Sequence, residues 1–348
     1  MNRFGWILLL SLLMPFGVSA GCLDNTRLTG VNLAGAEFNS KKLPGVIAKD
    51  YIYPSNQELA FVAAQGATII RLPFRWERLQ PRLDLAFDAA ELRRLQTTII
   101  QAQMHDLCVL LDVHNYAKYY SEPITSAAQQ DAFVDLWVNL ASALGNPDYV
   151  ALGLMNEPAY IPLADWATLA KRTLAALRKA GLSHLVMVGG GGWNGLHSWF
   201  SEQDGASNAI AFAGLKDPLK RTVIEVHQYA DRDYSGTAQD CYPPTHFDLP
   251  FARISQWARD NELQLFLGEF GMAATQPCME TLAYFLKLMR GNEWKGWSYW
   301  AGGRWWGDYP FALNSDLLNP SPQWAPLKAA FYRGGDLSPP LPPKDATD

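Results

Sequence analysis

The sequence predicts a protein of the α/β class that folds as a single (β/α)8 barrel, also called a TIM barrel. Two observations support this prediction. Short apolar runs alternate with longer amphipathic stretches over residues 27–332, and eight such runs occur. This alternation is typical of repeated βα units around a parallel sheet. The length of 348 residues also fits, because α/β barrels reach this size as one domain.

The elements of the barrel can be placed in order along the chain. Strands are predicted at residues 28–33, 68–72, 108–113, 150–155, 185–188, 223–226, 263–267 and 296–299. Helical periodicity predicts helices at residues 56–65, 88–104, 127–144, 163–179, 251–261 and 279–290. Residues 198–220 are mixed in composition and rich in Gly and Ser, so only a short helix is expected before the sixth strand.

Residues with chemical capability stand where these predicted strands end. They are Asn32, Arg71, His114, Asn115, Asn156, Glu157, His227, Tyr229, Glu269 and Trp300. A barrel brings the C-terminal ends of its strands to one face, and that face holds the active site in this fold. Solvent exposure explains why strand ends are polar, but it does not explain this choice of residues. The sequence therefore predicts one pocket that they share.

Two carboxylates in this set suggest a reaction. Glu157 ends the fourth predicted strand and Glu269 the seventh, so they face each other across the barrel. Cleavage of a glycosidic bond with retention needs two carboxyl groups about 5 Å apart, one protonated and one ionised. A lone Glu is more often a solvated or salt-bridged side chain. The pair on opposed strands indicates a retaining glycoside hydrolase.

Neighbouring residues suggest which carboxyl group does what. A nucleophile must be ionised, and Arg71 and Tyr229 are placed to give Glu269 a cation and a hydrogen-bond donor. The acid needs a raised pKa, which a negative charge on Glu269 would give Glu157. Asn156 is a candidate donor to the 2-hydroxyl of the sugar.

Other readings of these residues remain open. His114 and His227 with Glu269 would suit a metal, but no H-E-x-x-H spacing occurs, so neither a metal nor a cofactor is expected. No G-x-S-x-G motif supports a serine hydrolase. The glycine run at residues 189–192 lacks the Lys-Ser/Thr of a phosphate loop and predicts a tight turn. A barrel that binds carbohydrate without cleaving it is the alternative of another class.

Aromatic residues are numerous, with 13 Trp, 14 Tyr and 16 Phe. Sugar rings stack on aromatic faces, and the candidates near the predicted pocket are Tyr116, Trp193, Trp76, Trp305 and Trp306. A place in the core explains each of them equally well.

The ends and the charge of the chain bear on location and partners. Residues 1–20 have the positive start, apolar stretch and small residues of a secretory signal peptide, residues 21–333 would form the catalytic barrel, and residues 334–348 a Pro-rich flexible tail. A net charge of −5 without a basic run makes nucleic acid an unexpected partner. We expect a secreted monomer, extracellular or periplasmic, without a membrane span.

Four cysteines follow the predicted signal, namely Cys22, Cys108, Cys241 and Cys278. Export makes disulfides plausible, and four cysteines allow three pairings. Lipidation of Cys22 after signal cleavage is an alternative fate for that residue.

Several motifs together resemble the glycoside hydrolase family 5 cellulases. The resemblance runs from about residue 30 to residue 306 and rests on the motifs GVNLAG at 30–35, RLP at 71–73, DVHNY at 112–116, MNEP at 155–158, EVHQY at 225–229 and GEFG at 268–271. Residues 227–241, with Asp231, Ser235-Gly236-Thr237 and Cys241, resemble the subfamily of fungal and bacterial endoglucanases.

This resemblance implies a secreted endo-β-1,4-glucanase that cleaves internal bonds of cellulose-type glucans. It implies Glu157 as acid/base, Glu269 as nucleophile and Trp300 as the aromatic floor under the reacting sugar. The supporting shell that it implies consists of Arg71, His114, Asn156, His227 and Tyr229. It also implies a Cys241–Cys278 disulfide, which leaves Cys22 and Cys108 as the second pair. Mannan, xyloglucan and mixed-linkage β-glucan remain alternative substrates, because strand-end residues cannot separate them.

Overall fold

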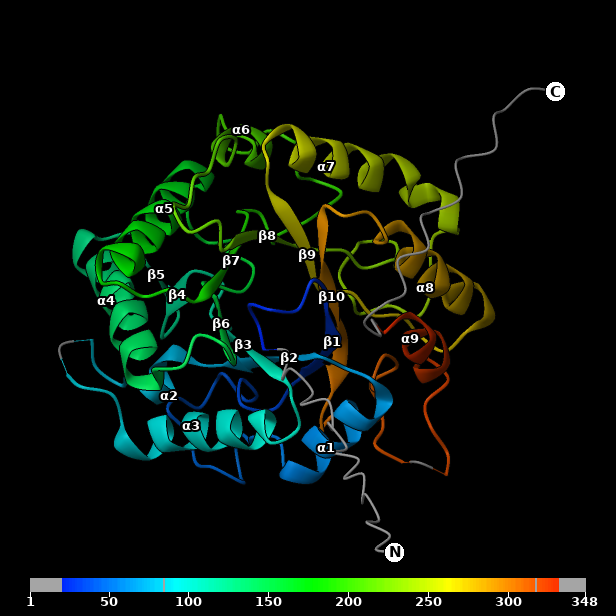
Figure 1. Cartoon of the computed structure of the whole chain (residues 1–348), viewed down its shortest axis with the longest axis horizontal. Coiled ribbons are helices and arrows are strands. Elements are labelled where there is room, and N and C mark those ends of the chain that lie inside the picture. The colour runs from blue at the N-terminus through cyan, green and yellow to red at the C-terminus, as the bar shows by residue number, and fades with distance from the viewer. Residues whose placement is uncertain (1–20, 84, 317, 332–348) are drawn as a thin grey trace, which may run out of the picture.

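The computed structural model describes residues 21–83, 85–316 and 318–331, and its centre is a closed barrel of eight parallel strands (Figure 1). The strands pair in the order β1-β10-β9-β8-β7-β6-β3-β2 and back to β1. Their bounds are β1 Leu28–Leu33, β2 Ile69–Phe74, β3 Cys108–Val113, β6 Val150–Gly153, β7 Leu185–Gly189, β8 Thr222–His227, β9 Gln264–Glu269 and β10 Trp294–Gly302. The predicted (β/α)8 barrel is confirmed.

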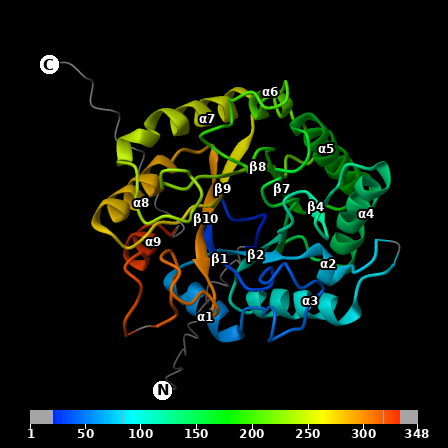
Figure 2. The same ribbon diagram turned by 180° about the vertical axis from the view of Figure 1, so that it is seen from behind.

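Helices form a ring outside the barrel in both views (Figures 1 and 2). They are α1 Asn56–Gln65, α2 Trp76–Leu79, α3 Ala89–Gln103, α4 Ala127–Leu144, α5 Leu163–Lys179, α6 Asn208–Ala211, α7 Asp248–Asp260, α8 Gln276–Leu288 and α9 Trp324–Ala330, with a 3-10 helix, η1, at Pro244–Phe247. The short α6 agrees with the weak helix expected between the fifth and sixth barrel strands.

The sequence prediction missed several small elements. Strands β4 (Lys118–Tyr119) and β5 (Glu122–Pro123) form an antiparallel hairpin after β3. The helices α2, η1 and α9 are also additions. Each is seven residues or shorter, which is too few to show a clear hydrophobic period.

Alternation along the strands divides the core into two parts. In β3, Val109, Leu111 and Val113 belong to the large cluster that also contains the apolar faces of the helices. Cys108 and Leu110 point the other way, into a smaller cluster inside the barrel. Successive side chains of a strand face opposite sides, so this second set fills the barrel interior.

The side chains that point into the barrel change from apolar to polar along several strands. The first inward residues are apolar, and two residues further on several rows become charged or polar. The inward pairs are Ile69 then Arg71 in β2, Leu110 then Asp112 in β3, and Val223 then Glu225 in β8. All three polar residues are almost fully buried. The upper half of the barrel interior is therefore polar and lies directly beneath the strand ends.

Gly268 in β9 makes room for one of these polar residues. A Cβ atom at this position would lie 2.0 Å from Oε1 of Glu225. Any larger residue would displace that carboxylate from the barrel interior. The glycine is therefore part of the packing that permits a buried Glu in β8.

Two disulfides link segments that are separated along the chain. Cys22 bonds to Cys108 at the start of β3, with a Cα–Cα distance of 4.9 Å, and Cys241 bonds to Cys278 in α8, with a distance of 5.3 Å. Both pairings agree with those that the family resemblance implied. The Cys22 thiol is used in this bond, which leaves none for a lipid.

Some predictions concern segments beyond this description. The signal peptide at residues 1–20 and the tail at residues 334–348 lie outside the described residues. Within the part of the chain that the structure describes, none of the helices has the length and apolar character needed to cross a membrane.

Candidate active site

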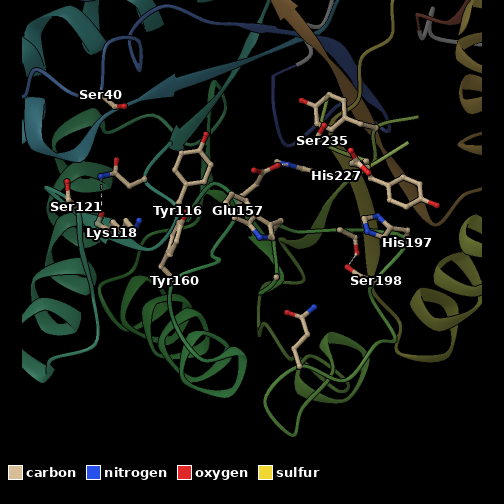
Figure 3. A pocket seen from close by; sticks show the side chains of 18 of the residues that line it. Ser40, Tyr116, Lys118, Ser121, Glu157, Tyr160, His197, Ser198, His227 and Ser235 are labelled. Atoms are coloured by element: carbon tan, nitrogen blue, oxygen red, sulfur yellow. Dashed lines mark hydrogen bonds and ion pairs between the residues drawn. The ribbon is translucent and has the colours of Figure 1, made fainter. Parts of the chain in front are cut away.

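A groove crosses the C-terminal end of the barrel and has a volume of about 950 Å³. Its walls come from the segments after β1, β2, β3, β6, β7 and β8. Glu157 lies near the middle (Figure 3). Ser40, Lys118 and Ser121 lie toward one end, and His197, Ser198 and Ser235 toward the other. A linear molecule could therefore lie across the barrel mouth with Glu157 beside its centre.

Arg71 lies under this groove, fully buried in the polar layer of the barrel. Its Nε donates to Glu225 Oε1 (2.9 Å), and its Nη1 donates to Glu269 Oε1 (2.8 Å) and Asn32 Oδ1 (3.0 Å). Its Nη2 donates to Asn156 Oδ1 (2.8 Å). Burial disfavours the charge of a guanidinium, but the surrounding carboxylates outweigh it and raise the pKa of Arg71. The cation is therefore permanent.

Arg71 also contacts a carboxylate at the end of β3. Its Nη1 lies 3.1 Å from Asp112 Oδ2. Burial raises the pKa of Asp112 to about 7, although the charge of Arg71 acts in the opposite direction. For Glu225 the balance is reversed, because Arg71 and His227 overcome the effect of burial and hold its pKa below the ordinary value.

Glu269, at the end of β9, is held by two strong donors. Besides Arg71 it accepts a 2.8 Å hydrogen bond from the Tyr229 hydroxyl at Oε2. Its side chain is 5% exposed. A buried carboxylate beside a fixed cation and a hydroxyl donor is stabilised in its ionised form.

Glu157 has a different environment, although it lies nearby. Its side chain is 16% exposed, and its Oε1 lies 2.8 Å from Nδ1 of His227. Burial raises its pKa, and the charge of Glu269 adds to this effect against the hydrogen bond from His227. Its φ of 44° lies in the left-handed region, which is uncommon for a non-glycine residue.

The two carboxyl groups are close enough to act on one bond. An oxygen of Glu157, an oxygen of Glu269 and a nitrogen of His227 all lie within 4.8 Å of one another. Retaining glycosidases place their carboxyl groups about 5–5.5 Å apart, whereas inverting enzymes need about 6.5–9.5 Å to admit a water molecule. The separation here fits the retaining geometry.

His227 and His114 have opposite protonation states because their neighbours differ. His227 contacts Glu157 through Nδ1 and Glu225 through Nε2 (3.3 Å), and these carboxylates with Glu269 outweigh burial and raise its pKa to about 10. It is therefore an imidazolium that donates from both nitrogens. Burial lowers the pKa of His114 well below its ordinary value, so this ring is neutral.

The neutral His114 joins the polar network to the groove. Its Nδ1 lies 2.7 Å from Asp112 Oδ2, and its Nε2 lies 3.1 Å from the Tyr116 hydroxyl and 3.3 Å from Nδ2 of Asn156. With the proton on Nδ1, Nε2 accepts from both neighbours. Its ring stacks on Trp300, with centroids 5.5 Å apart and planes 16° apart.

The cluster of Glu157, His227 and Glu269 could in principle hold a metal ion. Among the described residues, Glu157, His227 and Glu269 are near enough to ligate one cation. A histidine ligand must offer a free lone pair, and His227 is protonated with both nitrogens directed at carboxylates. The donor set therefore does not suit a metal ion, and it replaces the grouping of His114, His227 and Glu269 considered from the sequence.

Most of the predicted site residues converge, but some serve other purposes. Asn115 lies at the groove with its amide already committed, since Nδ2 donates to Glu77 and Oδ1 accepts from the Trp76 backbone. Trp76 is fully buried against Tyr119 and Phe133, so its suggested role in sugar stacking is wrong and it belongs to the core.

The remaining aromatic candidates surround the groove or its supports. Trp193 is 49% exposed and contacts Tyr116, with centroids 5.8 Å apart, and both line the groove. Trp305 is 38% exposed, whereas Trp306 packs edge-on against Trp300 at 5.5 Å. Trp300 is half-buried.

Sequence reasoning missed the roles of Asp112 and Glu225. Both lie two residues before a predicted strand-end histidine, and that spacing places them on the inward face of their strands. It also missed groove residues that follow the strand ends, such as Tyr160, His197 and Tyr234. Those lie in loops, where no period predicts orientation.

A barrel with a close pair of carboxyl groups in an open groove has the features of a glycoside hydrolase. Comparison with known proteins agrees. Residues 31–303 match the family described as Cellulase (glycosyl hydrolase family 5). The chain therefore belongs to glycosyl hydrolase family 5, the cellulase family.

Individual relatives give the same assignment. Endo-β-1,4-glucanase B of Aspergillus niger is 33% identical over 82% of this chain and 84% of its own length. The crystal structure of an endo-β-1,4-glucanase from Xanthomonas axonopodis pv. citri has 41% identity and a TM-score of 0.85, covering 88% of this chain and 98% of that one. XacCel5A, solved in complex with cellopentaose, has 40% identity and a TM-score of 0.84, covering 87% and 99%.

Glu37 is a further buried carboxyl group, in the segment after β1 that leads to the groove. Its Oε2 accepts from the Gly35 backbone (2.8 Å), while its buried Oε1 has no hydrogen-bond partner among the described residues. Arg78 donates to the carbonyls of Ala36 and Phe38 on either side. Burial raises the pKa of Glu37 to about 8, so it is protonated at neutral pH.

Stability should therefore fall as the pH rises through the titration of Glu37. Between its unfolded pKa near 4.5 and its folded pKa of about 8, only the folded chain holds this proton, so the free energy of unfolding decreases with pH. Glu37→Gln cannot titrate, and we expect its stability relative to wild type to rise by roughly 2–4 kcal/mol from pH 4.5 to pH 8.

Urea unfolding at several pH values measures this difference. Glu122→Gln, at an exposed position in β5, is the matched control and should follow the wild type at every pH. A constant difference between Glu37→Gln and wild type across this range would contradict the prediction.

Proposed function

We propose that this protein is a retaining endo-β-1,4-glucanase in which Glu157 is the acid/base and Glu269 the nucleophile. The observation that supports this most directly is the contrast between two carboxyl groups within 4.8 Å of each other. One accepts hydrogen bonds from the Arg71 cation and the Tyr229 hydroxyl, which favour a carboxylate, and the other is partly exposed with a raised pKa. These are the two states that the first chemical step requires.

In the first step, an oxygen of Glu269 attacks the anomeric carbon of the sugar bound over it. The bond from that carbon to the glycosidic oxygen breaks, and Glu157 gives its proton to the departing oxygen. The product is a glycosyl ester on Glu269 and a shortened chain with a new hydroxyl group. Arg71 and Tyr229 remain beside the ester oxygens that they held before the reaction.

The second step reverses these roles. Formation of the ester removes the negative charge of Glu269, which is one of the causes that raise the pKa of Glu157. Glu157 is then ionised and takes a proton from a water molecule as the water oxygen attacks the anomeric carbon. The ester bond breaks, and Glu269 leaves as a carboxylate. Two inversions give net retention.

Neighbouring groups hold the sugar during both steps. The amide oxygen of Asn156 accepts a hydrogen bond from Arg71, and its NH₂ group lies beside His114 Nε2. The second N–H of this group is then free to donate to the 2-hydroxyl of the sugar. That contact strengthens as positive charge develops on the ring. The half-buried Trp300 offers an aromatic face near the same sugar.

The shape of the groove favours cleavage inside a polymer. It continues to both sides of Glu157, so a chain can occupy it without presenting an end (Figure 3). The endo-β-1,4-glucanases named above, and the structural relative bound to cellopentaose, support a cellulose-type glucan as substrate. Two disulfides support an oxidising compartment, consistent with secretion.

The direct test is viscosity loss and reducing-sugar release from carboxymethyl-cellulose, with β-mannan and xyloglucan in parallel. We expect viscosity to fall well ahead of reducing-sugar release on the cellulose derivative, because internal cuts shorten the chain most. Activity confined to another glycan would overturn the substrate assignment. Binding without turnover on all three would favour a non-catalytic carbohydrate-binding barrel.

Glu157→Gln removes the proton donor and leaves the shape of the side chain. We expect a loss of roughly 10²–10⁴-fold in kcat on cello-oligosaccharides, the usual contribution of general acid catalysis. Aryl cellobiosides with acidic phenol leaving groups need little protonation, so their first step should be much less affected. An equal loss in kcat/KM, which reports the first step, on both substrate types would argue against the acid role.

Glu269→Ala removes the nucleophile, so turnover should be abolished. Azide fits the space left by the carboxylate and would attack from the same face, giving an α-glycosyl azide of inverted configuration from an activated β-cellobioside. Proton NMR of the product reads the anomeric configuration. A β-glycosyl azide would contradict the assignment of Glu269.

A further inference from the structure

The loop after β8 contains a buried carboxylate that the proposed mechanism does not use. Asp231 is 1% exposed. Its Oδ2 accepts from the Ser235 hydroxyl (2.9 Å) and from the backbone N–H groups of Thr237 (3.0 Å) and Ala238 (3.1 Å). Its Oδ1 accepts from the backbone N–H of Gly236 (3.1 Å). One side chain therefore organises residues 231–238.

The inner side of this loop lies against Tyr229. Gly236 has a φ of 73°, and a Cβ atom there would lie 2.7–2.9 Å from the ring of Tyr229. The Gly236 backbone is thus in direct contact with the ring face. The carbonyl of Gly236 accepts a 2.9 Å hydrogen bond from the Tyr309 hydroxyl, which gives the loop a second point of attachment.

Tyr229 connects this loop to the carboxyl pair. Its ring is buried, and its hydroxyl donates to Glu269 Oε2 at 2.8 Å. The ring also lies near Phe311, with centroids 6.3 Å apart and planes 29° apart. Close approach of the Gly236 backbone limits how far the ring can tilt, and in the present orientation the hydroxyl reaches Glu269.

We infer that Asp231 is a positioning residue for the nucleophile: it folds the 231–238 loop so that Gly236 braces the Tyr229 ring and keeps its hydroxyl on Glu269. This inference rests on the proposed function, in which Glu269 attacks the sugar. Asp231 itself touches neither the groove nor Glu269. Its effect on the reaction passes through the ring of Tyr229.

Asp231→Asn tests the link with a minimal change of shape. In one orientation the amide oxygen replaces Oδ2 and keeps its three donors, but the amide NH₂ then faces the backbone N–H of Gly236 and repels it. In the other orientation the NH₂ replaces Oδ2 and repels the backbone N–H groups of Thr237 and Ala238. Either outcome releases the loop from Tyr229. Thr237→Val is the matched control, because this exposed side chain bonds only to the Ser235 hydroxyl and its backbone N–H remains.

The sharpest measurement is a double-mutant cycle on kcat with cellopentaose, using Tyr229→Phe as the second change. Loss of a hydroxyl donor to a carboxylate should lower kcat by roughly 10–100-fold. We expect Asp231→Asn to lower kcat by about five- to twentyfold alone and by less than about twofold in the Tyr229→Phe background. KM should change little in all four proteins, and Thr237→Val should match the wild type.

Additive losses in the two backgrounds would overturn the inference, because a general loosening of the fold does not need the Tyr229 hydroxyl. If Asp231→Asn fails to fold, Gly236→Ala replaces it in the same cycle, since its added Cβ displaces the ring directly.

A crystal structure of the variant gives a readout that does not depend on activity. The distance from the Tyr229 hydroxyl to Glu269 Oε2 should exceed the present 2.8 Å in the variant, and an unchanged distance would refute the link. A wild-type chain that cleaves no glucan would defeat the proposed function alone, whereas an active enzyme with additive losses would defeat this inference alone.

Discussion

The buried guanidinium of Arg71 is the interaction on which the rest of the site depends. It lies inside the barrel with hydrogen bonds to carboxylates on β8 and β9 and to amides on β1 and the segment after β6. No one of these carboxylates would remain ionised at that depth without a cation, and the cation would not remain without them. The strands that supply the ligands are thereby held in one register. The charges at the mouth of the barrel follow from this cation beneath them.

The acidic groups and histidines above Arg71 differ in protonation because they differ in their contacts with this cation. Glu269 accepts hydrogen bonds from Arg71 and the Tyr229 hydroxyl, and its charge favours protonation of both Glu157 and His227. His114 lies near cations as well as carboxylates, and there burial decides that the ring is neutral. Two histidines at equivalent strand ends thus carry different charges. Position in the barrel brings the groups together, and local partners then assign the protons.

The sequence predicts the strand-end residues well because their placement needs only the ends of eight strands and the closure of a barrel. It predicts the interior less well. Asp112 and Glu225 follow from period-two alternation, yet a buried carboxylate is expected only once a partner such as Arg71 is known to share the interior. Trp76 could not be separated from the groove aromatics, because it begins the four-residue helix α2, which is too short to show a period that fixes the direction of its side chains.

Loop 231–238 belongs neither to the strand ends nor to the barrel interior. Its residues lie at no strand end and show no hydrophobic periodicity. The family resemblance therefore identifies them as a motif but does not explain their structural role. The structure supplies one: a carboxylate that accepts four donors turns a polar loop into a rigid support. Ser235 faces the groove on one side of that support, and Gly236 meets the Tyr229 ring on the other. A glucan chain in that part of the groove would therefore contact the same loop that positions the Tyr229 hydroxyl, the donor to Glu269. One loop would thus support both the substrate and the nucleophile.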